Sequence, residues 1–212
     1  MKNNYVDTSK LDICKHLEDS HTIILNDYQT FQFNFIRNNS FDDNYKLFKY
    51  AHESGVAMAR KRYVGEKWRK SKFKFYKKSH SWYAMQASNY KNDIWEGVLL
   101  SSRGENGELI NTPVGDEFFS NTINALKETD AKSIIIGRLP SGKSVPPHRG
   151  NKGIYRVHLG LIVPDGDVTF TCRGEDKKWE TGKCLAFNDF YEHSARNNTE
   201  HDRINLIVDV VR

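Results

Sequence analysis

The sequence predicts a mainly β protein of the sandwich or jelly-roll class, with helices flanking the sheets. The prediction rests on the last third of the chain, where short apolar runs recur at regular spacing between turn residues. The stretch 203–211 alternates apolar and other residues, which places Ile204, Leu206, Val208 and Val210 on one strand face. Because strand ends meet at one mouth in such a fold, residues that are distant in sequence can share a site.

The first 130 residues are expected to supply helices and a few strands. Helical patterns cover residues 8–17 and 42–59, and an amphipathic helix is predicted from 115 to 129. The alternation of phenylalanines over 31–35 indicates a strand, and a further strand is predicted over 95–103. These elements are expected to cover one face of the sheets.

The remaining residues are predicted to form the β core. The expected elements, in order, are a strand over 132–139, a Pro-, Gly- and Ser-rich loop over 140–147, and strands over 155–163, 168–172, 183–187 and 203–211. We predict a single domain over residues 1–212, because no repeat or linker interrupts it. In this domain residues 1–130 form the buttress and substrate-side elements, and residues 131–212 form the core.

Two histidines in this core, His148 and His193, are each followed by an arginine, Arg156 and Arg203 respectively. Neutral imidazole is the commonest protein ligand for a redox metal. The guanidinium group offers a rigid fork of donors that matches a carboxylate. The pattern therefore predicts a metal site beside a carboxylate site. His158 shares the inward strand face with Arg156, because alternate residues of a strand point to the same side.

A longer series of motifs carries a resemblance to a known family. The series consists of His148-x-Gly150, Arg156-x-His158-Leu159-Gly160-Leu161, the Pro164 turn, Trp179-x-x-Gly182-Lys183, Phe187-x-Asp189-x-x-Glu192-His193, and Arg203 ahead of Ile207-Val208-Asp209-Val210. In order and spacing it resembles the aspartyl/asparaginyl β-hydroxylase family of Fe(II)- and 2-oxoglutarate-dependent oxygenases. The resemblance covers roughly 75 of 212 residues, whereas the first 130 residues match only loosely.

This resemblance implies a cupin-like double-stranded β-helix that holds Fe(II) and uses 2-oxoglutarate and O2. Carried across, His148 and His193 are the iron ligands. Arg156 and His158 contact the 2-oxoglutarate carboxylate nearest the metal, and Arg203 holds the distal carboxylate. The expected reaction is hydroxylation of an unactivated C–H bond in a small or carrier-bound substrate that is amino-acid-like or anionic.

Gly150 occupies the position at which most related oxygenases have an acidic iron ligand. Members of the resembled family commonly lack this acid too, so the departure fits the resemblance. It leaves open an Fe(II)- and 2-oxoglutarate-dependent halogenase, with chloride in the vacant position. A non-enzymatic cupin-like binding protein is the alternative from another class. Family members act on peptidyl Asp or Asn, on free amino acids and on lipids, so the resemblance does not choose the substrate.

Each of these residues also has a structural interpretation. A lone histidine in a β-rich domain is more often structural than a ligand, which applies to His148, His158 and His193 taken singly. Arg203 is in this view a rim residue paired with Asp202 or Glu200. Asp189 and Glu192 are expected to be turn residues or supports, and a carboxylate that orients His193 is physically sensible.

Composition favours a cytoplasmic protein with no disulfide framework. The three cysteines, Cys14, Cys172 and Cys184, have no paired spacing, and neither a signal peptide nor a membrane span is apparent. Residues 60–78 hold ten lysines and arginines against one acid, so the net charge of +5 comes from this segment. Its structural interpretation is a solvated face over core aromatics. Its functional interpretation is a docking surface for an anionic substrate, with nucleic acid as a weaker candidate.

Overall fold

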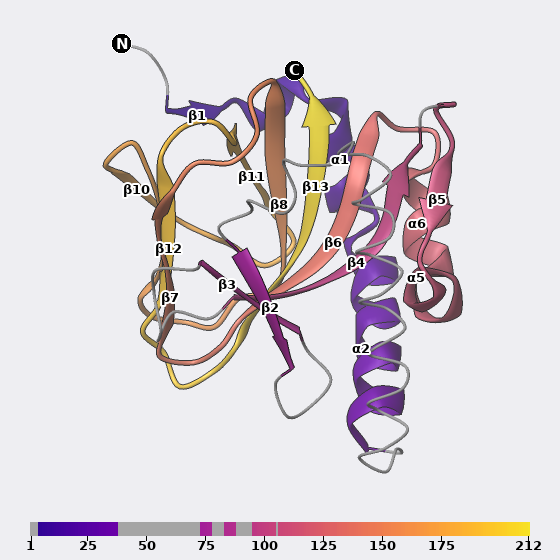
Figure 1. The fold of residues 1–212 in the computed structure, drawn as a ribbon, viewed down its shortest axis with the longest axis horizontal. Helices are drawn as coiled ribbons and strands as arrows, with labels where there is room; N and C mark the ends of the chain where they lie inside the picture. The colour runs from indigo at the N-terminus through magenta and orange to yellow at the C-terminus, as the bar shows by residue number, and fades with distance from the viewer. Residues whose placement is uncertain (1–3, 38–72, 78–82, 88–94, 105) are drawn as a thin grey trace.

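A computed structural model of the chain describes residues 4–37, 73–77, 83–87, 95–104 and 106–212. Within this part of the chain, two antiparallel sheets face each other, and helices cover the outer face of the larger sheet (Figure 1).

The larger sheet has nine strands within the described residues, in the order β1-β11-β8-β13-β6-β4-β3-β2, with β5 paired to β4. The strands are β1 (Tyr5–Val6), β2 (Phe73–Lys77), β3 (Tyr83–Ala87), β4 (Trp95–Arg103), β5 (Leu109–Asn111), β6 (Ala131–Leu139), β8 (Ile154–Ile162), β11 (Cys184–Asn188) and β13 (Arg203–Val211). The C-terminal strand β13 lies at its centre, between β6 and β8.

In the part of the chain that the structure describes, the smaller sheet has four strands in the order β10-β9-β12-β7. They are β7 (Lys143–His148), β9 (Val168–Cys172), β10 (Glu175–Lys178) and β12 (His193–Asn197). From β6 onward the chain passes back and forth between the two sheets, so that β6, β8, β11 and β13 face β7, β9, β10 and β12. This order is the topology of a double-stranded β-helix, the jelly roll that the sequence predicts.

Helices α1 (Asp12–Asp19), α2 (His21–Arg37), α5 (Pro113–Phe118) and α6 (Ser120–Leu126) pack on the outer face of the larger sheet, as Figure 1 shows. Their apolar side chains, Leu17, Ile24 and Leu126 among them, form one core with Val157 and Leu206 of the sheet. A second core fills the space between the two sheets. It consists of Tyr5, Leu139, Val168, Phe170, Cys172, Trp179, Leu185, Phe187 and Ala195.

Alternation along the strands decides which side chains enter which core. In β8, Val157 and Leu159 face the helices, whereas His158 packs against Phe170 and Phe187 between the sheets. In β13, the apolar face predicted from the sequence belongs to the helix-side core. The intervening residues of both strands therefore line the interior between the sheets, as predicted for His158.

The strand predicted over Phe31 to Phe35 is wrong, because these residues belong to α2. Ile24, Tyr28 and Phe31 are buried at helical spacing. This periodicity of the whole segment prevails over the local alternation of the phenylalanines. In the region of the helix predicted over residues 8–17, a short 3₁₀ turn (Thr8–Lys10) comes first, and the α-helix α1 begins at Asp12.

The single helix predicted over 115–129 is divided into α5 and α6. The chain breaks at Phe119, which has non-helical dihedral angles and ends α5. A cap supports each of the two starts: Thr112 Oγ1 accepts a hydrogen bond from Gly115 N, and the buried Asp27 carboxylate accepts one from Thr122 N at 2.8 Å. The predicted helix over 42–59 lies outside the described residues.

The loop predicted over 140–147 is only partly a loop, because its second half is strand β7. Both prolines of this strand, Pro146 and Pro147, are tolerated because β7 is an edge strand of the smaller sheet as far as the described residues show it. The predicted strand over 95–103 is confirmed as β4, and it pairs with β6. The single-domain assignment stays a prediction. Among the described residues, no helix combines the length and apolar character that crossing a membrane requires.

Candidate functional site

His148 and His193 meet at one end of the smaller sheet. His148 ends β7, His193 begins β12, and the two residues are direct cross-strand partners. Their ring centroids are 4.2 Å apart. His193 is also packed against Phe187 and Phe170, with ring centroids 4.7 and 5.7 Å away. The cross-strand pairing therefore brings together two histidines that lie 45 positions apart in the sequence.

The backbone fixes the orientation of both rings. His148 Nδ1 lies 2.8 Å from the Pro146 carbonyl oxygen, and His193 Nδ1 lies 2.7 Å from that of Tyr191. A carbonyl can only accept, so each Nδ1 carries the proton and each Nε2 is the unprotonated ring nitrogen. Burial lowers the pKa of both rings, and that of His193 falls to about 3. Two neutral imidazoles with fixed Nε2 atoms are suited to binding a metal.

The low pKa of His193 predicts how the stability of the metal-free protein depends on pH. The unfolded chain takes up a proton near the ordinary value of 6.5, but burial, and then the nearby His148, delays protonation of the folded state to about pH 3. The free energy of unfolding should therefore fall as pH drops from about 6.5 toward 3. In urea unfolding at pH 7 and pH 5, His193→Gln should lose less stability between the two values than wild type. An unchanged pH dependence, equal to that of the exposed-site control His201→Gln, would contradict this.

A second group of polar side chains surrounds Trp179 between the sheets. Arg203 lies over the indole ring at 4.5 Å, and the His158 ring stacks on it with centroids 6.0 Å apart. Trp179 Nε1 lies 3.3 Å from His158 Nδ1. The Asn205 amide, oriented with its oxygen toward these donors, accepts from Arg203 Nη1 at 2.9 Å. The same Asn205 oxygen also lies 3.1 Å from Trp179 Nε1, which shares its proton with His158 Nδ1. With His158 Nδ1 as an acceptor, the neutral ring carries its own proton on Nε2.

Two donors of this group are buried without a hydrogen-bond partner, namely His158 Nε2 and Arg203 Nε. Arg203 is 1% exposed, and no ion pair to it occurs within the described part of the chain. Burial lowers the pKa of its guanidinium to about 9, so the group remains charged at neutral pH. A buried cation with an unused donor is costly unless an anion binds to it.

The rim interpretation of Arg203 is wrong. Asp202, one of its two expected partners, instead pairs with Arg138, with Arg138 Nη2 2.7 Å from Asp202 Oδ2. Arg203 begins β13 in register with Leu139, and its side chain turns into the interior. This arrangement leaves the guanidinium available to a ligand between the sheets.

Asp189 lies next to the two histidines. Its side chain is fully buried, and Oδ1 lies 3.9 Å from His193 Nε2. The Asn151 backbone N–H donates to Oδ2 at 2.6 Å. Burial raises the pKa of this carboxyl, while the Arg156 guanidinium opposes the shift. Asp189 thus lies beside His193 but does not orient its ring by a hydrogen bond, because Nε2 is unprotonated and Nδ1 donates to the Tyr191 carbonyl oxygen.

The Asp189 carboxylate also explains why residue 150 is glycine. A Cβ atom at Gly150 would lie 2.0 Å from Asp189 Oδ2 and 2.3 Å from its Cγ. In place of a side chain from position 150, this carboxylate from the β11–β12 turn fills the space beside the histidines. The space in which an acidic side chain at position 150 would begin is therefore occupied by the carboxylate of Asp189.

Gly150→Ala should consequently displace Asp189. Overpacking a buried position costs about 1–3 kcal/mol of folding free energy, and metal affinity should fall because the carboxylate moves. Urea unfolding and a Co(II) titration measure the two effects. Because the clash is between these two side chains, adding Asp189→Ala should cost less stability than the sum of the single changes. Strictly additive losses would mean that the two residues do not meet.

Arg156 lies in β8, two residues before His158, and its guanidinium contacts two carboxylates. Nη1 lies 2.9 Å from Asp189 Oδ1, and Nε lies 2.7 Å from Asp209 Oδ1. Contact of Arg156 with 2-oxoglutarate stays a prediction.

The five residues predicted from the sequence therefore gather in one region between the sheets. Sequence reasoning gave no role to Trp179, Asn205 or Asp209. A signal was available for two of them, because Asn205 and Asp209 alternate with the apolar residues of β13 and share the inward face of Arg203.

The donor set fits an iron site with two protein ligands. No group of three or more His, Cys, Asp or Glu side chains with metal-binding geometry occurs among the residues that the structure describes. The fit rests on the paired Nε2 atoms of His148 and His193, and on the buried donors that neighbour them. His158 and His193 share Phe170 and Phe187 as ring contacts, which places the two parts of the site side by side.

A double-stranded β-helix with facing histidines at one end, and buried hydrogen-bond donors between its sheets, defines a cupin-like jelly-roll protein. A sequence model of the aspartyl/asparaginyl beta-hydroxylase family matches residues 52–212. The chain belongs to this family.

Two curated relatives each match about a third of the chain. The chain is 45% identical over 74 residues to the ornithine lipid ester-linked acyl 2-hydroxylase of Rhizobium tropici, which covers 34% of this chain and 26% of that protein. It is 40% identical over 70 residues to the human aspartyl/asparaginyl beta-hydroxylase, covering 32% of this chain and 9% of that protein. The matched stretch thus spans about a quarter or less of these relatives.

Two of the solved structures that the chain resembles share a distant likeness with it. A 2OG-Fe(II) oxygenase family oxidoreductase from Burkholderia pseudomallei has a TM-score of 0.39 and 12% identity, over 55% of this chain and 68% of that one. A predicted oxalate decarboxylase from Thermotoga maritima has a TM-score of 0.37 and 20% identity, over 56% and 82%. Similarity at this level assigns neither a reaction nor a substrate.

Proposed function

We propose that the protein is an Fe(II)- and 2-oxoglutarate-dependent hydroxylase that oxidises an unactivated C–H bond of a small or carrier-bound substrate. The observation that carries this proposal is the pairing of two neutral, oriented histidines with two buried donors that lack acceptors. Membership of a hydroxylase family supports it. When bound, iron and 2-oxoglutarate would supply the oxidising chemistry, and the protein would bind and orient the reactants.

Each side chain has a defined part in this proposal. His148 and His193 would hold the metal through Nε2. His158 Nε2–H would donate to the carboxylate of 2-oxoglutarate nearest the metal, as would Arg156. Arg203 would pair with the distal carboxylate in a site from which water is excluded by the Trp179 indole.

The test is Fe(II)-dependent conversion of 2-oxoglutarate to succinate by the purified protein. We expect slow succinate formation without substrate, and faster formation with one. A panel of aspartyl and asparaginyl peptides, free amino acids and acyl-linked amino acids samples the substrate types that the relatives' names suggest. A cupin-like binding protein without activity would form no succinate under any of these conditions, and that result would overturn the proposal.

Halogenation has no supporting contact among the described residues. The space beside Gly150 that would have to admit chloride is filled by the Asp189 carboxylate. A second negative group there would be repelled unless Asp189 were protonated or moved.

We further propose that the basic segment 60–78 captures an anionic substrate. Most of it lies outside the described residues, and Phe73–Lys77 is described only as strand β2 of the larger sheet. Exposed charges act through fields that salt screens over about 8–10 Å at physiological ionic strength. Charge reversal at Lys70, Lys72 and Lys74 should therefore raise the KM for an anionic substrate, most strongly at low salt, and leave kcat and substrate-free succinate formation unchanged. Loss of substrate-free turnover in a folded variant would place the segment in the active site instead.

A further inference from the structure

Asp209 and Arg156 form a two-point ion pair across neighbouring strands of the larger sheet. They are direct partners in the β13–β8 register. Arg156 Nε donates to Asp209 Oδ1 at 2.7 Å and Nη2 donates to Oδ2 at 3.0 Å. A planar guanidinium held by two parallel bonds cannot rotate about its own axis, so the direction of its third nitrogen is also fixed.

That third nitrogen, Nη1, lies close to Asp189, which neighbours the two histidines. Arg156 Nη1 lies 2.9 Å from Oδ1 of the fully buried Asp189, and this same oxygen lies 3.9 Å from His193 Nε2. On the far side, Ser133 Oγ donates to Asp209 Oδ2 at 3.0 Å. A continuous chain of polar contacts therefore runs from β6 through β13 and β8 to the histidines.

The charges along this chain favour a cation at its end. The two carboxylates of Asp189 and Asp209 flank the one guanidinium of Arg156 in a mostly buried region. Without Asp209, the Arg156 guanidinium would lose the two hydrogen bonds that set its orientation. With Asp209 present, the guanidinium is shared, and Asp189 retains negative potential toward the two neutral imidazoles.

We propose that Asp209 is a positioning residue for the metal site: it fixes Arg156, and through Arg156 it holds the Asp189 carboxylate beside His148 and His193. Asp209 thereby acts on the site from β13 without touching metal or substrate. The inference rests on the proposed function, because it assigns a role toward the metal that this function requires. The competing explanation is that the pair only ties β13 to β8.

The test compares Co(II) binding to wild type and to Asp209→Asn, without 2-oxoglutarate, by visible absorption. Asparagine keeps the shape of the side chain and removes the charge and one acceptor. Loss of an outer-sphere partner typically lowers metal affinity about 10- to 100-fold. We expect a rise in the Co(II) Kd of at least about 10-fold and a changed absorption band, because Asp189 shifts. A purely structural role would lower the unfolding midpoint and leave the affinity and the band of the folded fraction unchanged.

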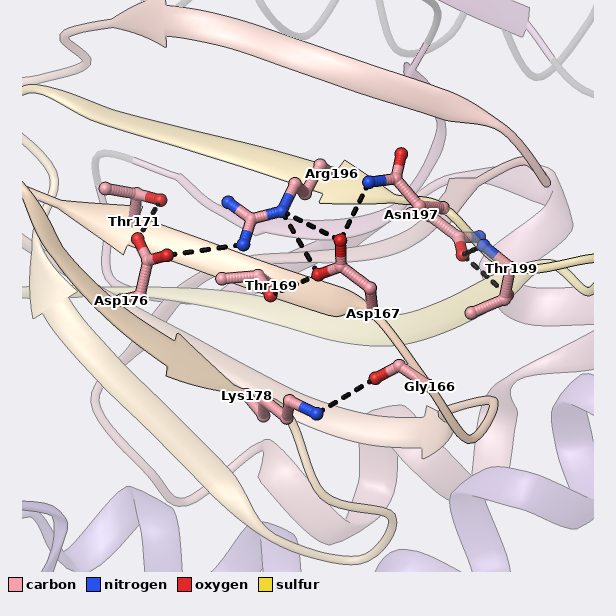
Figure 2. Close-up of polar contacts among 10 residues, drawn as sticks. Gly166, Asp167, Thr169, Thr171, Asp176, Lys178, Arg196, Asn197 and Thr199 are labelled. Carbon is pink, nitrogen blue, oxygen red and sulfur yellow. Dashed lines mark hydrogen bonds and ion pairs between the residues drawn. The ribbon is translucent and has the colours of Figure 1, made fainter.

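Asp167→Asn is the matched control. It also removes an arginine-paired carboxylate, because Arg196 Nε lies 3.1 Å from Asp167 Oδ1 on the outer face of the smaller sheet (Figure 2). Both variants change the net charge by the same amount, but only one touches the chain of contacts that leads to the histidines. An equal loss of Co(II) affinity in both would be a net-charge effect and would overturn the inference.

Ser133→Ala keeps the inference testable if Asp209→Asn does not fold. It removes only the hydroxyl that donates to Asp209, so a smaller change of the same sign is expected in affinity and absorption. If wild type fails to bind Co(II), the proposed function fails. If wild type binds Co(II) and both Asp209→Asn and Ser133→Ala bind it with unaltered Kd and band, only the role of Asp209 is refuted. If Asp209→Asn cannot be purified folded, an unaltered Ser133→Ala alone refutes that role.

Discussion

His148→Ala or His193→Ala is expected to abolish Fe(II)-dependent succinate formation. His148 and His193 are cross-strand partners with ring centroids 4.2 Å apart, and no group of three or more potential ligands occurs among the described residues, so neither loss should be compensated. With one remaining histidine, metal would be held by a single protein ligand. Iron or Co(II) titration of the purified variants, with succinate formation as the second readout, measures the effect.

The exposed His201→Ala serves as the control, since it removes an imidazole of the same chain away from the pair. It should bind Co(II) and form succinate as wild type does. A folded His148→Ala or His193→Ala protein that keeps its iron affinity and its turnover would show that the metal assignment is wrong.

The region around these histidines was predictable because strand alternation is a local property of the sequence. Alternate residues of β13 and β8 face opposite cores, so the apolar face of β13 and the inward position of His158 could be predicted. The paired histidines were proposed from residue type and family resemblance. Their 4.2 Å separation depends on the β7–β12 register, which no local pattern contains.

The errors arose where a short pattern competed with a longer one or with tertiary contacts. Three alternating phenylalanines suggested a strand, but the helical spacing of Ile24, Tyr28 and Phe31 governs α2. The break between α5 and α6 depends on Asp27, a carboxylate about 95 residues earlier in the chain that accepts the Thr122 N–H. A pattern restricted to a few neighbours cannot reveal such a partner.

The polar contacts that connect Asp209 and Arg156 to Asp189 could not be predicted from the sequence for a similar reason. Asp209 was visible as an acid in an apolar strand, but its pairing with Arg156 requires β13 and β8 to be neighbours in a particular register. The consequence for Gly150 requires in addition that the β11–β12 turn carries Asp189 into the same space. Residue types were therefore predictable, whereas their partners depended on the register of the sheet.

Arg203→Ala should raise the 2-oxoglutarate requirement far more than it alters folding. Truncating one partner of a buried, charge-assisted pair costs about 2–5 kcal/mol, which corresponds to about a 30-fold to a 4,000-fold loss of affinity. The free energy of unfolding should fall by less. The Arg203 cation is buried without an ion-pair partner in the described part of the chain, so its removal also removes a desolvation cost. The 2-oxoglutarate affinity of Arg203→Lys should lie between those of wild type and Arg203→Ala, because lysine keeps the charge but lacks the planar fork of donors.

The measurement is the KM for 2-oxoglutarate in succinate formation, together with urea unfolding of each variant. Arg196→Ala is the control, because Arg196 pairs with Asp167 and Asp176 on the outer face of the smaller sheet, as Figure 2 shows. Its loss should leave the KM unchanged. If Arg203→Ala is folded and its KM equals that of Arg196→Ala, Arg203 is a structural residue. Its buried Nε and its contact with Trp179 then serve the packing between the sheets, and the distal carboxylate of 2-oxoglutarate must be bound elsewhere.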